Sequence, residues 1–96
     1  MIDFLDNCNL KKETLKELSK KYPSELFDLN SNEDECIEII KYLRNIGINC
    51  VDELLLHRID IFYNSKNEIQ NKFMKYNINE VVAEINNDYT KIDELF

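Results

Sequence analysis

The clearest hydrophobic pattern of the chain lies in residues 31–49, where apolar side chains recur every three or four positions. This spacing places them on one face of a helix and predicts a helix of about residues 33–46. Ser31 precedes Asp34 by three residues, close to the spacing of a capping box, and is predicted to cap this helix. Gly47, the only glycine, suits the left-handed position that ends a helix. The apolar face consists of Cys36, Ile39, Ile40, Leu43 and Ile46.

Two shorter helices are predicted before this one. Apolar residues from Leu10 to Tyr22 share one face of a helix of roughly residues 10–21, with Asn9 as the expected N-cap. Pro23 ends that helix and suits the first turn of a second one, over residues 23–29. Residues 1–9 are expected to form a short helical turn over one end of the core. Ile2, Phe4 and Leu5 would provide its apolar contacts.

The second half of the chain repeats the alternation of longer and shorter helical segments. Asn49 is the expected N-cap of a helix of about residues 50–57, and a short apolar segment follows at residues 59–63. Ser65 and Glu68 match a capping box and open a further helix. Asn77 is predicted to end it in a left-handed C-cap conformation. Short helices are expected at about residues 80–86 and 92–96.

These segments show an internal period of about 30 residues, which is typical of stacked helical repeats. The period separates Gly47-Ile48-Asn49 from Asn77-Ile78-Asn79. A capped helix precedes each triplet, and a short helix follows it. The sequence therefore predicts an all-α fold of one domain, residues 1–96. Its architecture is a small right- or left-handed stack of helix–short helix–helix repeats, with approximate units 10–47, 48–77 and 78–96. An irregular helical bundle is the alternative.

The order of these segments resembles the repeat of the mitochondrial transcription termination factor family. The resemblance rests on a leucine-bearing helix, the Pro23-initiated segment through Phe27, and a capped helix that ends in Leu43 to Ile48. It covers roughly residues 10–96, and it implies repeats of two helices and a short 3₁₀ helix. The family binds nucleic acid along a basic concave face. This chain departs from the pattern at Ile59 and Asn77, where the second unit lacks the proline and the glycine.

Charge changes the functional expectation that the resemblance gives. The formal net charge is −7, from 19 acidic and 12 basic residues. Phosphate recognition relies on basic surfaces, so this balance disfavours a nucleic-acid or anionic-membrane surface. It is compatible with a protein partner that presents a basic surface, and also with a role in solubility alone. Nucleic-acid binding would require one of two sets of lysines to converge on one face: Lys11, Lys12, Lys16, Lys20 and Lys21, or Lys66, Lys72 and Lys75.

Motifs for catalysis and metal binding are not evident. A catalytic histidine needs a nucleophile or carboxylate partner, which a sequence cannot show, so His57, the only histidine, is expected to be a helix-boundary residue. Glycine-rich phosphate loops and calcium loops are missing from the sequence. Cys8, Cys36 and Cys50 form no CxxC pair, which argues against zinc and suits a reducing cytosol. We therefore expect no catalytic residue, metal or cofactor, and Cys36 as a buried hydrophobe.

The aromatic residues divide into two groups by their place in the pattern. Tyr63, Tyr76 and Tyr89 fall near breaks between helices, where a ring can pack while its hydroxyl reaches water. The other group is expected in the core: Tyr42, Phe27, Phe62 and Phe73.

Neither a signal peptide nor an apolar run long enough to span a bilayer is recognisable, so we expect a cytoplasmic protein.

The densest charge patch opens the central helix and provides the candidate contact residues, Glu33, Asp34, Glu35 and Glu38. Carboxylates in a first helical turn favour the helix dipole, which is their simplest role. As a surface, they favour a non-catalytic acidic module that binds a protein with a basic surface. One alternative is an anti-CRISPR-like inhibitor from a phage or mobile element that mimics nucleic acid. The other is a nucleic-acid-binding helical repeat protein.

Overall fold

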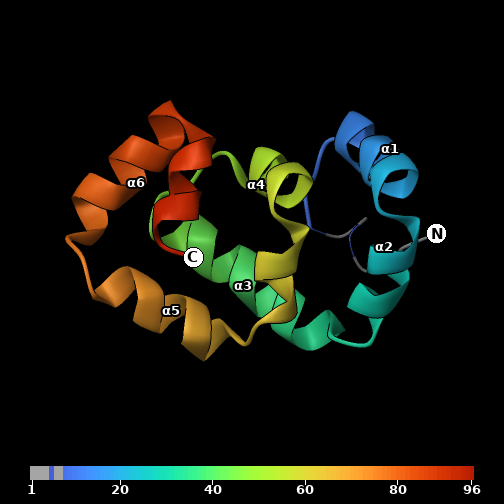
Figure 1. The fold of residues 1–96 in the computed structure, drawn as a ribbon, viewed down its shortest axis with the longest axis horizontal. Coiled ribbons are helices and arrows are strands. Elements are labelled where there is room, and N and C mark those ends of the chain that lie inside the picture. The colour runs from blue at the N-terminus through green and yellow to red at the C-terminus, as the bar shows by residue number, and fades with distance from the viewer. Residues whose placement is uncertain (1–4, 6–7) are drawn as a thin grey trace.

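A chain of helices joined by short turns makes up the structure, a computed structural model that describes residues 5 and 8–96. Within that part of the chain every regular element is helical, which confirms the predicted all-α class (Figure 1). The elements are α1 (Lys12–Lys21), α2 (Pro23–Asn30), α3 (Glu33–Asn45), α4 (Val51–His57), η2 (Ile59–Tyr63), α5 (Lys66–Met74), α6 (Ile78–Asn87) and η3 (Tyr89–Glu94), where η denotes a 3₁₀ helix.

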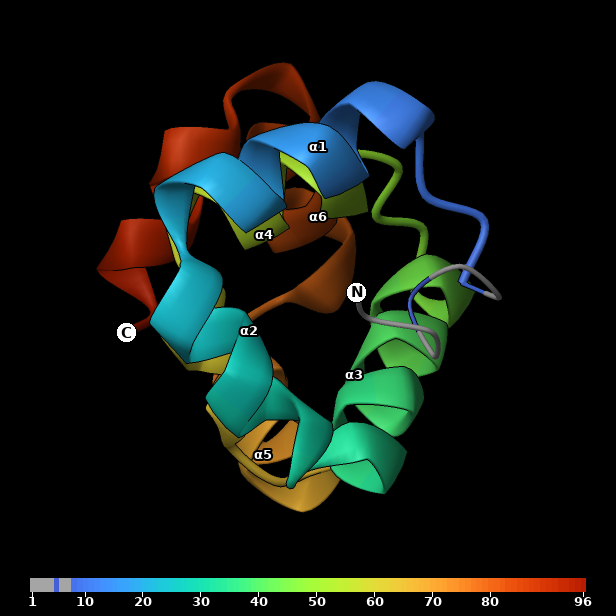
Figure 2. The ribbon, with the colours of Figure 1, turned by 90° about the vertical axis from the view of Figure 1, so that its right-hand side faces the viewer.

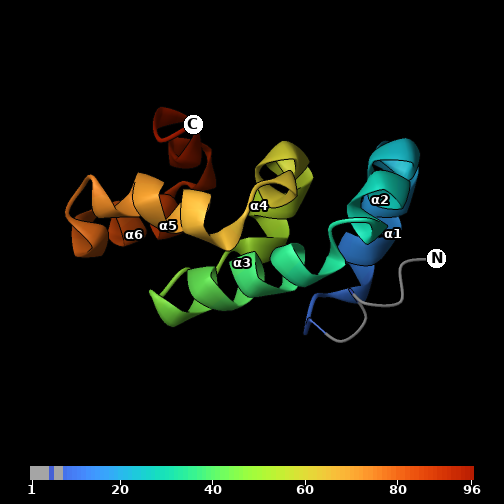
Figure 3. The same ribbon diagram turned by 90° about the horizontal axis from the view of Figure 1, so that it is seen from below.

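The central helix α3 packs against elements from both halves of the chain. Its neighbours are α2, α4, α5 and η2. Four residues of its predicted apolar face are confirmed as buried, because Cys36, Ile39, Ile40 and Leu43 are each at most 1 % exposed. The fifth, Ile46, is the C-cap of α3 and is half-buried. Seen from below, α3 runs along one side of the molecule beneath α4 (Figure 3).

The end of α3 forms as the sequence predicts. Gly47 has a φ of 104°. This is a left-handed conformation that glycine adopts without steric cost. The amide of Ile48 donates to the carbonyl of Leu43 at 2.9 Å, and that of Gly47 donates to the carbonyl of Arg44 at 3.1 Å. These two bonds define a Schellman motif. Ile48 folds back into the core, where it is 2 % exposed.

The predicted N-cap of the first helix is wrong. Asn9 does not cap α1 but has a positive φ of 57°. Asparagine tolerates this conformation. The N-cap position belongs to Lys11, which makes no side-chain capping bond. Instead its amide donates to Oδ2 of Asp52 at 2.9 Å. A carboxylate from α4 therefore serves the start of α1, where amides lack partners within the helix.

Ser31 is also not the cap of α3. The chain turns so tightly after α2 that Ser31 is its C-cap, and its amide donates to the carbonyl of Asp28 at 3.1 Å. Asn32 takes the N-cap position of α3 without a capping bond. Its side-chain amide points elsewhere, donating to the carbonyls of Phe62 at 3.3 Å and Asn64 at 3.4 Å.

Residues 47–49 are held by a partner that is distant in sequence. The side chain of Asn86 donates to the carbonyl of Gly47 and accepts from the amide of Asn49, both at 2.9 Å. Asn49 is therefore not the cap of α4, where Cys50 occupies that position without a side-chain bond. This clamp joins the end of α6 to the turn between α3 and α4.

The predicted capping box at Ser65 is confirmed. Its hydroxyl accepts from the amide of Glu68 at 3.2 Å, and the Glu68 carboxylate accepts from the amide of Ser65 at 3.4 Å. The prediction for Asn77 is wrong, because its φ is −72° and it caps the start of α6. Its Oδ1 accepts from the amide of Glu80 at 3.2 Å, so the residue that we assigned to the end of α5 belongs to the start of α6.

The predicted core aromatics divide in the structure. Phe62 and Phe73 are fully buried, and Tyr42 packs edge-on against Phe73 at a ring-centroid distance of 6.1 Å. Phe27 contradicts its prediction, since it is 77 % exposed. Leu26 and Leu29 occupy the buried face of α2, so the ring between them points away from the core.

The N-terminal segment is held to α3 by Arg44. Its guanidinium donates to the carbonyls of Cys8 and Asn9, and Leu5 and Cys8 lie in the core. The predicted contacts of Ile2 and Phe4 lie outside the described residues.

The described residues extend over 37 × 24 × 20 Å, with different helices at the two ends of the long axis. In Figure 1, α1 and α2 lie at one end, and α5 and α6 lie at the other. The view from the first end shows α1 stacked over α4 and α2 in front, in agreement with their contacts (Figure 2). α2 and α6 therefore lie on different parts of the molecule.

Candidate functional site

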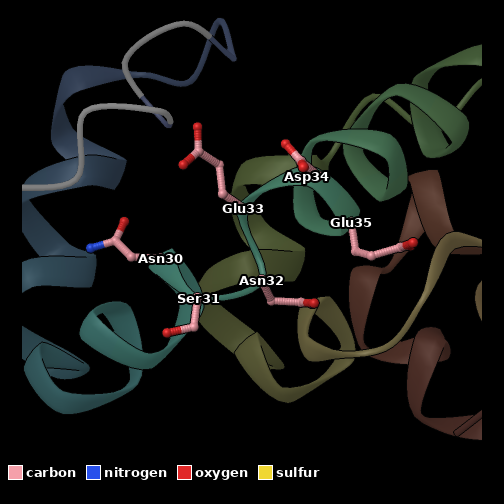
Figure 4. A pocket seen from close by; sticks show the side chains of 6 residues that line it. All are labelled: Asn30, Ser31, Asn32, Glu33, Asp34 and Glu35. Atoms are coloured by element: carbon pink, nitrogen blue, oxygen red, sulfur yellow. The ribbon is translucent and has the colours of Figure 1, made fainter.

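The four predicted contact residues lie in the first two turns of α3, at the corner where the chain leaves α2. The corner encloses an open pocket of about 470 Å³, lined by Asn30, Ser31, Asn32, Glu33, Asp34 and Glu35 (Figure 4). Its lining consists of polar residues throughout. Figure 4 shows the carboxylates of Glu33 and Asp34 directed to one side of the corner, and that of Glu35 directed to another.

Glu35 has an internal partner that separates it from its neighbours. Its Oε2 accepts a hydrogen bond of 2.7 Å from the amide of Lys66, the first residue of α5. That amide has no acceptor within its own helix, and a negative charge at a helix N-terminus is favourable. Glu35 is half-buried, and its hydrogen bond with Lys66 joins α3 to α5.

Glu33, Asp34 and Glu38 remain exposed, and we call this set the acidic edge. Within the described residues none of the three has an ion pair or a side-chain hydrogen bond. Asp34 and Glu38 are four residues apart and share one face of α3, where like charges repel each other. The dipole of α3 offsets the charge of Asp34 in the first turn but not that of Glu38, one turn further on.

The sequence immediately before and within the acidic edge is free of cations, and the first cation after it is Lys41, which is exposed on α3 three residues beyond Glu38. Neither lysine nor arginine occurs between residues 23 and 40. The lysines that precede this segment lie on α1 or at its start and are all exposed: Lys11, Lys12, Lys16, Lys20 and Lys21. Two lysines of the second set considered for nucleic-acid binding lie over aromatic rings. Nζ of Lys66 is 5.8 Å from the ring centroid of Tyr42, and Nζ of Lys72 is 5.7 Å from that of Phe96.

A second cluster of charges joins the C-terminal 3₁₀ helix to the middle of the chain. Nε2 of His57, the last residue of α4, lies 2.9 Å from Oδ2 of Asp93 in η3. Arg58 donates to Asp93 at 2.7 Å and to both carboxylate oxygens of Asp60 at 2.9 and 3.0 Å. The ring of Tyr89 packs edge-on against His57 at a centroid distance of 5.4 Å. We call these five residues the η3 latch.

Hydrogen bonds determine the ionisation of the latch. His57 and then Arg58 donate to Asp93, and these bonds hold the pKa of Asp93 below its usual range. Arg58 has the same effect on the pKa of Asp60. The two carboxylates in turn raise the pKa of Arg58. His57 thus lies at a helix end as predicted, and its contacts in the described structure are these acidic and aromatic side chains.

The thiol of Cys36 is buried and is not a reactive group. Burial raises the pKa of Cys36 to about 12. Its thiol therefore stays protonated at neutral pH, and the thiolate is the reactive form. Among the described residues no group of histidine, cysteine, aspartate or glutamate has the arrangement to hold a metal ion. In the same part of the chain no helix is long and apolar enough to cross a membrane.

Sequence reasoning identified the acidic edge and missed the η3 latch. Arg58 and Asp60 are two residues apart at a helix end, which is a visible signal for an ion pair. Asp93 lies 35 residues from Arg58, and no local pattern connects the two. The role of Glu35 was hidden for the same reason, because its partner Lys66 belongs to another helix.

Comparisons with known proteins give no relative for this chain. No protein-family model, curated protein or solved structure matches it. The resemblance to mitochondrial transcription termination factor repeats therefore stays a prediction.

Proposed function

We propose that this protein is a non-catalytic interaction module whose acidic edge binds a protein partner with a basic surface. The observation that carries the proposal is the set of exposed carboxylates of Glu33, Asp34 and Glu38, which have no partner among the described residues. Asp34 and Glu38 repel each other on one helix face. A lysine- or arginine-bearing partner would remove that repulsion and gain charge-assisted hydrogen bonds.

Glu35 is not part of the proposed contact, although the sequence grouped it with its neighbours. Its carboxylate already accepts from the amide of Lys66. A partner that used this group would have to break a bond between α3 and α5. The proposed edge is therefore narrower than the acidic run in the sequence.

Charge reversal combined with cross-linking tests this proposal. A photo-reactive residue placed at Asn45, exposed at the far end of α3, would capture partners from a lysate of the source cells. We expect cross-links with the wild-type background and at least a tenfold loss, roughly, when Glu33, Asp34 and Glu38 are all changed to Lys. The matched control changes Glu13, Glu17 and Glu80 to Lys, since these exposed residues lie on other helices and alter the net charge equally.

The two variants separate local from global electrostatics. Loss in the edge variant alone supports the acidic edge as the contact. Equal loss in both variants would mean that only net charge matters, and retained capture in the edge variant would exclude this surface.

A nucleic-acid mimic is the second candidate, favoured by the complete absence of cations from residues 23–40. In this form, which includes an anti-CRISPR-like inhibitor, the edge occupies the DNA-binding surface of an enzyme. Duplex DNA should then displace the captured partner, and the displacement should weaken as salt rises. A partner that binds DNA and this protein together contradicts mimicry while leaving the interaction module intact.

We further propose that α3–α4–η2 and α5–α6–η3 are two copies of one structural unit. They share the order helix, helix, 3₁₀ helix, which supports the repeat expected from the sequence.

The buried thiols of Cys36 and Cys50 are compatible with a reducing cytosol, where we place the protein. Nucleic-acid binding is the third candidate function, and it would use the exposed lysines of α1. A gel shift that does not weaken as the salt concentration rises would contradict it.

A further inference from the structure

A pocket of about 210 Å³ opens where the turn after α5, helix α6 and the end of η3 meet. Val81, Ile85 and Leu95 form its apolar walls, and Tyr76 contributes a ring that is 51 % exposed. Glu84 brings a carboxylate to the same space. The pocket therefore offers apolar surface to a hydrocarbon stem and a negative charge to a positive end group.

The charge of the pocket lining is net negative. Its charged residues are Glu84, Glu94 and Lys91. Lys91 pairs with Glu94 at an N–O distance of 3.4 Å, whereas Glu84 has no ion pair or side-chain hydrogen bond within the described residues. Helix α6 adds no cation, because neither lysine nor arginine occurs between residues 76 and 90. The carboxylate of Glu84 is therefore available to a cation that enters the pocket.

Two large hydrophobic side chains at the end of α5 remain exposed. Met74 is 61 % exposed, and Tyr76, two positions later, is 51 % exposed. Their exposure forfeits the free energy that burial would supply. Tyr76 lines the pocket and Met74 does not, so a small ligand inside the pocket would leave Met74 in water. A protein segment that covers both side chains fits this surface better than a small molecule does.

We propose that this pocket binds an arginine side chain of a protein partner. The stem of the arginine would pack against Val81, Ile85 and Leu95. Its guanidinium would donate two parallel hydrogen bonds to Glu84 and stack on the exposed ring of Tyr76. Lysine fits less well, because its strongly hydrated ammonium group can make neither the paired bonds nor the planar stack.

The size of the pocket agrees with the entry of a single side chain. An apolar cavity of about 150 Å³ is enough to hold benzene, and an arginine side chain has only about one more non-hydrogen atom. Pockets that hold whole small-molecule ligands are usually larger, at about 300–1,000 Å³. Arginine is also a frequent anchor of protein interfaces, where the surrounding contacts exclude water from it.

Lys91 opposes an entering cation and gives the proposal a second charge that can be tested. Its pair with Glu94 involves side chains that are 49 % and 67 % exposed, and such pairs contribute little. Removing the charge of Lys91 should therefore strengthen arginine binding, while removing the charge of Glu84 should weaken it. A neutral apolar occupant would respond to neither change.

An arginine-bearing peptide tests the pocket directly. The capped peptide acetyl-Leu-Arg-Leu-amide is titrated into the full ¹⁵N-labelled 96-residue chain, and amide chemical shifts are followed by NMR. We expect saturable shifts at Val81, Glu84 and Leu95, with a dissociation constant of roughly 1 mM. The matched peptide carries citrulline, which has a neutral group of similar shape, and should bind roughly three- to tenfold more weakly. Equal binding of both peptides would overturn the proposal, as would the absence of saturable shifts at these amides.

Two single substitutions in the pocket should act in opposite directions. Glu84→Gln should weaken binding of the arginine peptide roughly three- to tenfold, and Lys91→Gln should strengthen it roughly two- to fivefold. Glu17→Gln is the control, because Glu17 is exposed on α1 and its loss alters the net charge as Glu84→Gln does. Unchanged affinity in Glu84→Gln would overturn the proposal, as would weaker binding in Lys91→Gln.

Two further outcomes separate this inference from other accounts of a basic ligand. Butylguanidinium carries the same charge and stem without a peptide, so its tighter binding would indicate a small-molecule occupant and overturn the assignment to a protein partner. The inference does not depend on the acidic edge, which opens α3. Peptide shifts at Asp34 and Glu38 without shifts at Val81 would overturn the pocket while leaving the proposed function in place.

Discussion

Gly47 carries the most specific conformational demand in the described chain. Its φ of 104° lies in the region that side chains with a Cβ rarely adopt, and a Cβ added there would meet Cγ1 of Val82 at 3.4 Å. Since that distance is an ordinary contact, the cost of a substitution is conformational. The position was predicted from sequence because a single glycine after a periodic helix is a local signal.

We expect Gly47→Ala to lower the free energy of unfolding by about 1–2 kcal/mol, the cost of a left-handed backbone for a residue with a Cβ. Gly47→Asn should cost less, because asparagine tolerates this region. Urea denaturation monitored by circular dichroism measures both. Asn45→Ala, at an exposed site in the last turn of α3, is the control. As an ordinary surface substitution, it should stay within about 0.5 kcal/mol of the wild type. Equal losses at Gly47 and Asn45 would contradict the argument.

Residue-scale predictions failed where two signals competed at one position. Phe27 looked like core because hydrophobicity was the only information, yet Leu26 and Leu29 already fill the buried face of α2. Asn9, Ser31 and Asn49 are good capping residues by type, but their tertiary or local backbone partners decided the caps. Asp52 replaces Asn9 at the start of α1, and Asn86 takes the amide of Asn49. These partners are distant in sequence, so the residue types alone could not predict them.

At the scale of elements, single carboxylates join helices that are distant in sequence. Glu35→Ala leaves the amide of Lys66 without its acceptor. We expect this loss to lower the free energy of unfolding by about 1–2 kcal/mol. Glu38→Ala is the control, on the same helix but exposed and without a partner among the described residues. It should change the free energy of unfolding by less than about 0.5 kcal/mol. Thermal and urea unfolding of the two variants gives the comparison. Similar losses would show that charge on α3, and not the bond to α5, determines stability.

The η3 latch predicts an acid-sensitive C-terminal element. The pKa of Asp93 is lower in the folded chain than in the unfolded one. Its carboxylate therefore stabilises the fold above the unfolded pKa of about 4, and that contribution is lost as the pH falls through the lower, folded pKa. The melting temperature of Asp93→Asn should lie below that of the wild type at neutral pH and approach it as the pH falls below about 4. A constant difference across this range would show that the latch does not act through ionisation.

The boundaries that were predictable are those with a strong local signal: Pro23 between α1 and α2, Gly47 after α3, and the Ser65 capping box before α5. The expected caps at Asn9, Ser31, Asn49 and Asn77 were wrong, and the last short helix, expected at 92–96, is η3 (Tyr89–Glu94). The connections between elements were not predictable. The clamp of Asn86 on Asn49 joins positions 37 residues apart, and the pairing of Arg58 with Asp93 joins positions 35 residues apart. For the candidate site, the sequence located the acidic run, whereas only the structure separated Glu35 from the exposed acidic edge.

At the scale of the whole molecule, the core protects its thiols. Cys8, Cys36 and Cys50 are at most 9 % exposed. A thiol reagent such as DTNB therefore reaches them only when the structure opens. We expect negligible labelling of the native protein within minutes and labelling of all three thiols in urea. Variants that destabilise the fold, such as Gly47→Ala, should label faster, in line with their loss of stability. Rapid native labelling of one thiol would show that its surroundings open independently of the rest.

If the protein binds a basic partner as proposed, the separation of lysine-rich α1 from the cation-free segment 23–40 would also affect how fast the two meet. It gives the molecule an uneven electrostatic field, with the net positive α1 before α2 and the acidic corner after it. A basic surface therefore attracts one part of the molecule and repels the other, which orients the protein before contact. The acidic edge would then influence the association rate more than the lifetime of the complex. Moderate salt, which screens this orientation over a distance of about 10 Å, should slow binding while leaving dissociation nearly unchanged.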